Sequence, residues 1–185
     1  MNKLSVRGLT VCGVFVAVAF VLSFLRLFSL PLGGSVTLCS MLFVCIIGYM
    51  YGPKYGLIAA FTYGILQFVQ NPEIYSIPQV TVDYFLAFTA LGLSGFVNTK
   101  RLRLQLGYLL GITGRFFFAT LSGYVFWGSY TPDGWNPLVY SVCYNGAYIY
   151  AEGIITLIIL SIPAVKSLID NIAAMSEDTP VTSQH

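Results

Sequence analysis

The stretch GWNPLVYSVCYNGAYIYAEGIIT, residues 134–156, decides how the rest of the chain is interpreted. It is apolar enough to lie in a bilayer, yet it carries polar and half-polar groups that lipid does not tolerate on an outward-facing surface. Asn145, Tyr148 and Glu152 follow one another at helical spacing, and Ser141 extends the same face by one turn. We therefore predict a membrane helix whose polar stripe faces the interior of the protein.

The overall composition is that of an integral membrane protein. The chain has 185 residues, of which 57% are hydrophobic and 9% are charged, and its mean hydropathy is +0.79. Soluble domains have about 25% charged residues. Successive apolar runs leave no room for a separate soluble module. We predict one transmembrane domain over residues 1–170 and a polar tail without regular structure over residues 171–185.

Turn signals divide the apolar sequence into six segments. The predicted spans are residues 5–27, 36–51, 55–69, 79–97, 104–127 and 137–165. The second and third spans are short enough that they either tilt or dip into the membrane without crossing it. The predicted fold class is an all-α, integral membrane six-helix bundle.

The distribution of basic residues predicts the orientation of this bundle. With six spans, Arg26 alone lies on one side together with the acidic loop residues Glu73 and Asp133. The other basic residues of the loops lie on the opposite side: Lys3, Arg7, Lys54, Lys100, Arg101, Arg103 and Lys166. We therefore expect a multi-pass protein of the cell membrane. By the positive-inside rule, both of its termini are expected to lie on the cytoplasmic side.

Small residues in the first span define a surface that another helix can approach closely. Gly13 and Ala17 lie four residues apart, in a small-xxx-small pattern. The pattern alone favours packing inside this bundle over docking of a partner.

Three ionisable residues lie within the predicted membrane region, where facing lipid would cost several kcal/mol. Arg115 and Glu152 lie ~18 and ~22 Å along their helices, counted from the outer ends at about 1.5 Å per residue. They either form a structural ion pair or contact a ligand. Asp83 is shallower, so it either contacts a ligand or pairs with Arg26 or a loop backbone.

The residue pattern favours binding over catalysis. Trp127 and Trp135 lie at the predicted outer interface, where an aromatic belt is expected in any case. The sequence shows no nucleophile next to a base, no phosphate-binding glycine loop and no metal-ligand cluster, so we predict no catalytic residues, no metal and no cofactor. The scattered basic residues do not indicate nucleic-acid binding. An aromatic and acidic pocket that opens outward suits a flat organic cation.

Residues 114–152, GRFFFATLSGYVFWGSYTPDGWNPLVYSVCYNGAYIYAE, resemble the last two helices of the thiamine-specific S-components of energy-coupling factor (ECF) transporters. S-components are the substrate-binding subunits of these ABC-type transporters. GGSVTLCSM, residues 33–41, and QVTVDYFLAF, residues 79–88, are further matches, and the resemblance covers residues 10–165. It implies capture of thiamine from outside, with uptake driven by a transmembrane coupling subunit and two cytoplasmic ATPases.

The resemblance also implies roles for individual positions. It places the coupling subunit at Gly13 and Ala17. It assigns substrate contacts to Asp83, Tyr84, Arg115, Trp127, Tyr140, Asn145 and Glu152. To these we add two aromatic residues of the same region, Trp135 and Tyr148.

Three departures from the family pattern affect the expected ligand. Ala119 stands where the family has a histidine, Asp83 stands where it has glutamate, and Ala151 replaces the proline before Glu152. A thiamine precursor or analogue is therefore an alternative to thiamine itself. An S-component for another vitamin, and a membrane enzyme or scaffold in which Arg115 and Glu152 only support the bundle, are further alternatives.

Overall fold

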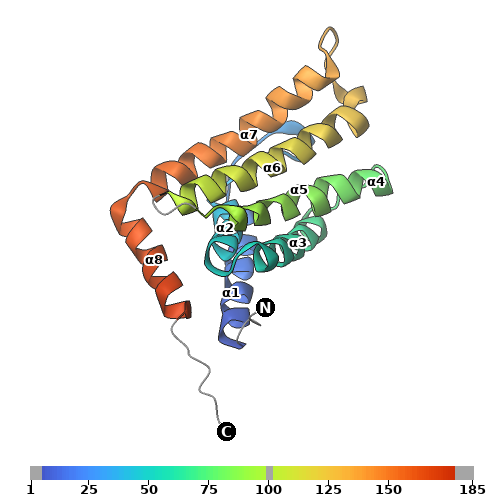
Figure 1. Ribbon diagram of the computed structural model, residues 1–185. Helices are drawn as coiled ribbons and strands as arrows, with labels where there is room; N and C mark the ends of the chain where they lie inside the picture. The colour runs from blue at the N-terminus through green and yellow to red at the C-terminus, as the bar shows by residue number, and fades with distance from the viewer. Residues whose placement is uncertain (1–5, 99–101, 178–185) are drawn as a thin grey trace.

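The computed structural model describes residues 6–98 and 102–177, which are mainly helical (Figure 1). The all-α prediction is confirmed. Lys3, Lys100 and Arg101, which contribute to the predicted orientation, lie outside the described residues. The longer helices are α1 (Val6–Ser23), α2 (Ser40–Tyr51), α3 (Pro53–Gln70), α6 (Arg103–Phe126), α7 (Pro137–Leu160) and α8 (Pro163–Glu177). Among the described residues, α1, α6 and α7 are long and apolar enough to cross a membrane.

The short helix α2 is the centre of the bundle. Most of its side chains are buried, including Met41, Val44 and Ile47, and it packs against α1, α3 and α6. Its 12 residues are fewer than the roughly 20 that a perpendicular span needs. The apolar sequence of this segment therefore serves the core of the protein.

Residues 77–96 form one helical segment with a changing pitch. It consists of α4 (Ile77–Val80), the π-helical turn η2 (Thr81–Leu86), α5 (Ala87–Thr89) and the 3₁₀ helix η3 (Ala90–Phe96). The segment packs closely on α3, because a Cβ atom on Gly64 would lie 2.5 Å from the Tyr84 carbonyl oxygen. Wide π-helical turns often occur at functional sites. Here the wide turn contains Asp83 and Tyr84.

A small β-hairpin lies between α1 and α2, where the sequence predicts only a loop. Strand β1 (Arg26–Ser29) pairs antiparallel with β2 (Ser35–Thr37), and the 3₁₀ turn η1 (Pro31–Gly33) joins them. β2 contacts α7. The hairpin therefore brings the turn η1 across to the helices that carry the predicted site.

The predicted sixth span is too long, and the predicted tail starts too early. α7 ends at Leu160, and α8 begins at Pro163 with a sharp change of direction (Figure 1). Pro163 ends α7 because proline lacks the N–H that an interior helical position requires. Residues 171–177, predicted to lack regular structure, belong to α8. That helix is held to the bundle by buried Ile169 and by a 2.9 Å hydrogen bond from the Tyr49 hydroxyl to Asp170 Oδ1.

Candidate functional site

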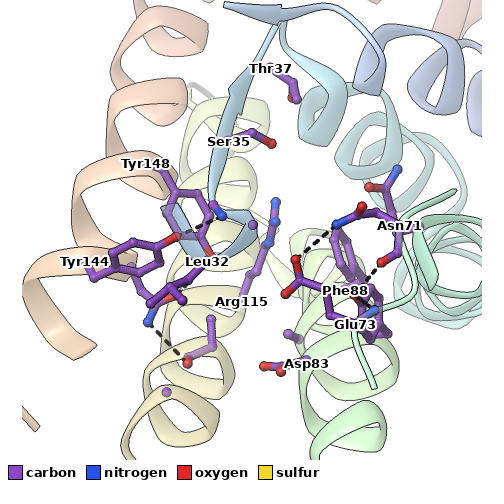
Figure 2. A pocket seen from close by; sticks show the side chains of 18 of the residues that line it. Leu32, Ser35, Thr37, Asn71, Glu73, Asp83, Phe88, Arg115, Tyr144 and Tyr148 are labelled. Atoms are coloured by element: carbon purple, nitrogen blue, oxygen red, sulfur yellow. Dashed lines mark hydrogen bonds between the residues drawn. The ribbon is translucent and has the colours of Figure 1, made fainter. Parts of the chain in front are cut away.

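A cavity of about 170 Å³ lies between the hairpin, α3, the segment 77–96, α6 and α7 (Figure 2). Most of the predicted substrate-contact residues line it, although they come from distant parts of the sequence. These are Asp83, Tyr84, Arg115, Trp127, Tyr140, Asn145, Tyr148 and Glu152. Trp135 does not line it: its side chain is 54% exposed and makes an edge contact with Tyr140.

The Asp83 carboxylate is positioned by two neutral donors. Gln79 Nε2 donates to Asp83 Oδ2 at 2.6 Å, and the Trp127 indole Nε1 donates to the same oxygen at 3.2 Å. Trp127 lines the cavity, whereas Gln79 is completely buried behind Asp83 and does not line it. Both bonds go to Oδ2, and no donor among residues 6–98 and 102–177 bonds to Oδ1, which is available to a ligand. The predicted alternative of a pair with Arg26 is not formed among the described residues.

Tyr84 holds the loop that precedes α4. Its hydroxyl donates to the Asn71 carbonyl oxygen at 2.6 Å and accepts from the Glu73 N–H at 3.0 Å. Its ring packs edge-on against Phe68. These bonds bring Glu73 into the cavity lining. Sequence analysis places Glu73 only in an external loop, and the contact between Tyr84 and the loop is not visible in the sequence pattern.

Arg115 does not form the predicted ion pair with Glu152. Its guanidinium carbon lies 4.3 Å from the centre of the Phe88 ring and 5.9 Å from the centre of the Tyr148 ring. Such cation–π contacts use the faces of the rings and leave the N–H donors in the guanidinium plane available. Within the described residues, Arg115 has no hydrogen bond and no ion pair. Its donors therefore remain available to an acceptor in the cavity.

Glu152 instead anchors the second strand of the hairpin and the start of α2. Its Oε2 accepts from Thr37 N at 3.0 Å and from Thr37 Oγ1 at 2.7 Å. Its Oε1 accepts from Met41 N at 3.3 Å and from Ser40 Oγ at 3.4 Å. The side chain is 2% exposed. A buried carboxylate is stable here because several donors replace its water, and one of them is an unpaired N–H at the first turn of α2.

Asn145 is also occupied by protein partners. Its Nδ2 donates to Ser141 O at 2.9 Å and to Ala119 O at 3.3 Å, and its Oδ1 accepts from the Tyr148 hydroxyl at 2.9 Å. These bonds join α6 to α7 at the cavity wall. Ala119 contributes only a methyl group to this wall. Because the Asn145 amide is occupied, the tyrosine rings of α7 are the main part of its polar stripe that remains available in the cavity.

The aromatic side chains of α7 form a continuous row. Tyr140, Tyr144 and Tyr148 lie with successive ring centres 6.0 and 5.8 Å apart. The Tyr144 hydroxyl also accepts from Gly34 N at 2.9 Å and donates to the Pro31 carbonyl oxygen, so it holds the turn η1 beside the cavity. Trp127 also lines the cavity, and it packs against Tyr75 and Tyr130.

The small-residue surface on α1 faces away from this cavity. Gly13 and Ala17 are both exposed, and a Cβ atom on Gly13 would meet nothing within 4 Å. Packing inside the bundle, which the pattern alone favours, is therefore wrong for these two positions. The surface is open to lipid or to a partner.

The cavity combines carboxylates, aromatic faces and two guanidinium groups, of which that of Arg115 has no hydrogen-bond acceptor among the described residues. Such a set can bind a flat cationic ligand, with ring stacking for affinity and polar groups for orientation. Within residues 6–98 and 102–177, no cluster of three or more His, Cys, Asp or Glu side chains is arranged to hold a metal ion.

Comparison with known proteins places the chain in a family. The family model described as "Thiamine transporter protein" matches residues 9–170. The chain is 31% identical over 151 residues to the thiamine transporter ThiT of Bacillus subtilis, with 71% of this chain and 76% of that protein covered. It is 26% identical over 121 residues to ThiT of Lacticaseibacillus paracasei, with coverages of 56% and 60%. A solved structure of ThiT from Listeria monocytogenes superposes with a TM-score of 0.68 at 26% identity, over 85% of this chain and 96% of that one. The chain therefore belongs to the thiamine transporter protein family.

Proposed function

We propose that this membrane protein captures thiamine, or a close thiamine precursor or analogue, from outside the cell for uptake. The observation that carries the proposal is the Asp83 carboxylate, which is fixed beside the Trp127 indole in an aromatic cavity and has one oxygen that no described residue bonds. A carboxylate next to an aromatic face complements a thiazolium ring in both charge and shape. The available donors of Arg115 suit an acceptor atom elsewhere on the ligand.

Transport requires partners that this chain does not supply. We propose that it acts as an S-component, binding substrate without catalysing a reaction. Its coupling subunit docks on the exposed Gly13 and Ala17 surface of α1, and two ATPases supply the energy. The start of α1 and the end of α8 lie toward the same end of the molecule, which supports placing both termini on the cytoplasmic side (Figure 1).

One observation favours a ligand other than thiamine. Ala119 leaves the wall between α6 and α7 without a polar side chain at the position where the family has histidine. A precursor or analogue that lacks the matching polar atom loses nothing in this cavity, whereas thiamine loses one hydrogen bond. The ligand panel below distinguishes the two.

Thiamine binding is expected to quench the fluorescence of the purified protein. The chain has two tryptophans, and Trp127 lines the cavity whereas Trp135 does not. Saturable quenching should persist in Trp135→Phe and disappear in Trp127→Phe. Titration with thiamine, its phosphates and its isolated pyrimidine and thiazolium fragments then ranks the ligands. If none of these quenches the wild-type protein saturably, the proposed function is wrong.

Asp83→Asn is expected to weaken binding of thiamine about tenfold, because a charge-assisted contact is lost. The Asn side chain still offers an oxygen to Gln79 and Trp127, so the local structure should be retained. A neutral isostere, in which a thiophene ring replaces the thiazolium ring, should lose much less affinity. Isothermal titration of both ligands measures the difference, and equal losses would show that Asp83 has a structural role.

A further inference from the structure

The loop between α3 and α4 is held at both sides of Glu73. The Glu73 N–H donates to the Tyr84 hydroxyl at 3.0 Å, and its carbonyl oxygen accepts from Gln79 Nε2 at 3.2 Å. Gln79 Oε1 also accepts from Tyr75 N at 3.0 Å. With its backbone fixed in this way, the side chain has a defined direction. Figure 2 shows the Glu73 carboxylate pointing into the cavity.

This carboxylate has few protein partners. Asn71 Nδ2 donates to Glu73 Oε1 at 3.3 Å, and the described residues provide no other side-chain donor to either oxygen. An ionised carboxylate can accept about four hydrogen bonds. Glu73 therefore retains unused acceptor capacity on the cavity side, in contrast to Glu152, whose two oxygens accept from Thr37, Ser40 and Met41.

The charges that line the cavity do not balance. Three carboxylates, from Glu73, Asp83 and Glu152, face two guanidinium groups, from Arg26 and Arg115. None of these opposite charges forms an ion pair within the described residues. One negative charge is thus in excess, and without Glu73 the lining would be neutral. A carboxylate held without a cationic partner in a partly desolvated cavity is stabilised when a cation binds.

Gln79 links the backbone of Glu73 to the carboxylate of Asp83. The same Nε2 atom that donates to the Glu73 carbonyl also donates to Asp83 Oδ2, at 2.6 Å. The turn η1 closes the other side of Glu73, because a Cβ atom on Gly33 would lie 2.5 Å from Glu73 Oε1. Glu73 therefore lies where the loop before α4, the wide turn η2 and the turn η1 meet around the mouth of the cavity.

From this geometry we propose that Glu73 is a specificity-determining residue that contacts the ligand directly. It supplies the excess negative charge that makes the site select a monocation over a neutral ligand of the same shape. Asp83 and Glu73 approach the ligand from two elements, so the preferred class is a cationic heterocycle that also carries a hydrogen-bond donor. The inference rests on the proposed function, because it assigns a role within the same cavity.

The test uses purified full-length protein and the two ligands named above, thiamine and its neutral thiophene isostere. Glu73→Gln keeps the side-chain shape and an acceptor for Asn71 but removes the charge. It is expected to weaken thiamine binding about tenfold and to change binding of the isostere by less than about twofold, so the preference for the cation largely disappears. Glu73→Asp keeps the charge and should retain the preference at a lower affinity.

Asp133→Asn is the matched control, because it removes the same charge from an exposed external loop outside the cavity. It should leave both affinities within about twofold of wild type. If Glu73→Gln loses affinity for both ligands equally, or for neither, the role of Glu73 is refuted. Thiamine binding by the wild type would still uphold the proposed function in that case. If the wild type binds the pyrimidine fragment but neither of these two ligands, the role of Glu73 is refuted; if it binds none of the ligands of the panel, the proposed function itself fails.

Discussion

Replacing Glu152 by alanine is expected to lower the free energy of unfolding by about 3–5 kcal/mol and to weaken thiamine binding about a hundredfold. The substitution leaves the buried N–H groups of Thr37 and Met41 without acceptors. It also removes the bonds that join the end of β2 to α7, so the hairpin is held beside the cavity less firmly, with the Tyr144 hydroxyl still bonded to the turn η1. The expected loss of affinity therefore follows from the position of the hairpin and not from a lost ligand contact.

Two further variants separate these effects. Glu152→Gln retains one acceptor oxygen but turns an amide donor toward other donors. Its stability and its thiamine affinity should therefore lie between those of the wild type and those of Glu152→Ala. Asp170→Asn changes a carboxylate that accepts from Tyr49 far from the cavity, and it should leave thiamine affinity unchanged. Thermal unfolding in detergent and isothermal titration measure stability and affinity. Wild-type affinity in Glu152→Ala would contradict the anchoring role.

Gly33→Ala is expected to weaken thiamine binding roughly thirtyfold. Gly33 has φ +85°, a left-handed conformation that costs an L residue roughly 1–2 kcal/mol, and the added methyl group would overlap Glu73 Oε1. The turn η1 and the Glu73 carboxylate cannot then both keep their positions. Titration calorimetry with thiamine measures the loss.

Gly134→Ala is the matched control for backbone strain. Gly134 has nearly the same φ, +83°, but a Cβ atom there would meet nothing within 4 Å. It should reduce stability slightly and leave thiamine affinity unchanged. In a Glu73→Ala background, Gly33→Ala should cause a much smaller additional loss, because the overlapping atom is absent. If both glycine variants lose affinity equally, strain and not the contact with Glu73 explains the effect.

Much of the candidate site could be predicted from local sequence. The helical spacing of Tyr148 and Glu152 with Asn145 predicts one polar face, and these side chains do line the same cavity. Asp83 and Tyr84 stand out because polar residues open an otherwise apolar helix. Their assignment as ligand contacts stays a prediction.

The errors concern contacts between segments that are distant in the sequence. Arg115 and Glu152 have opposite charge and similar predicted depth, so an ion pair is the natural expectation. Depth along a helix does not determine the direction of a side chain, however, and Glu152 bonds to Thr37, 115 residues away. The sequence predicts the same outer interface for Trp135 and Trp127, but of the two only Trp127 bonds to Asp83.

The sequence by itself determined the membrane character, the helical class and the polar stripe of residues 134–156, because hydropathy and periodicity are local properties. The tertiary structure alone decided which polar groups are occupied by the protein and which remain available. Packing of the hairpin against α7 occupies Glu152, whereas the bonds of Tyr84 and Gln79 direct Glu73 into the cavity. The physical reason is that burial strongly favours a partner for a polar group, and which partner it finds is set by the three-dimensional arrangement of segments.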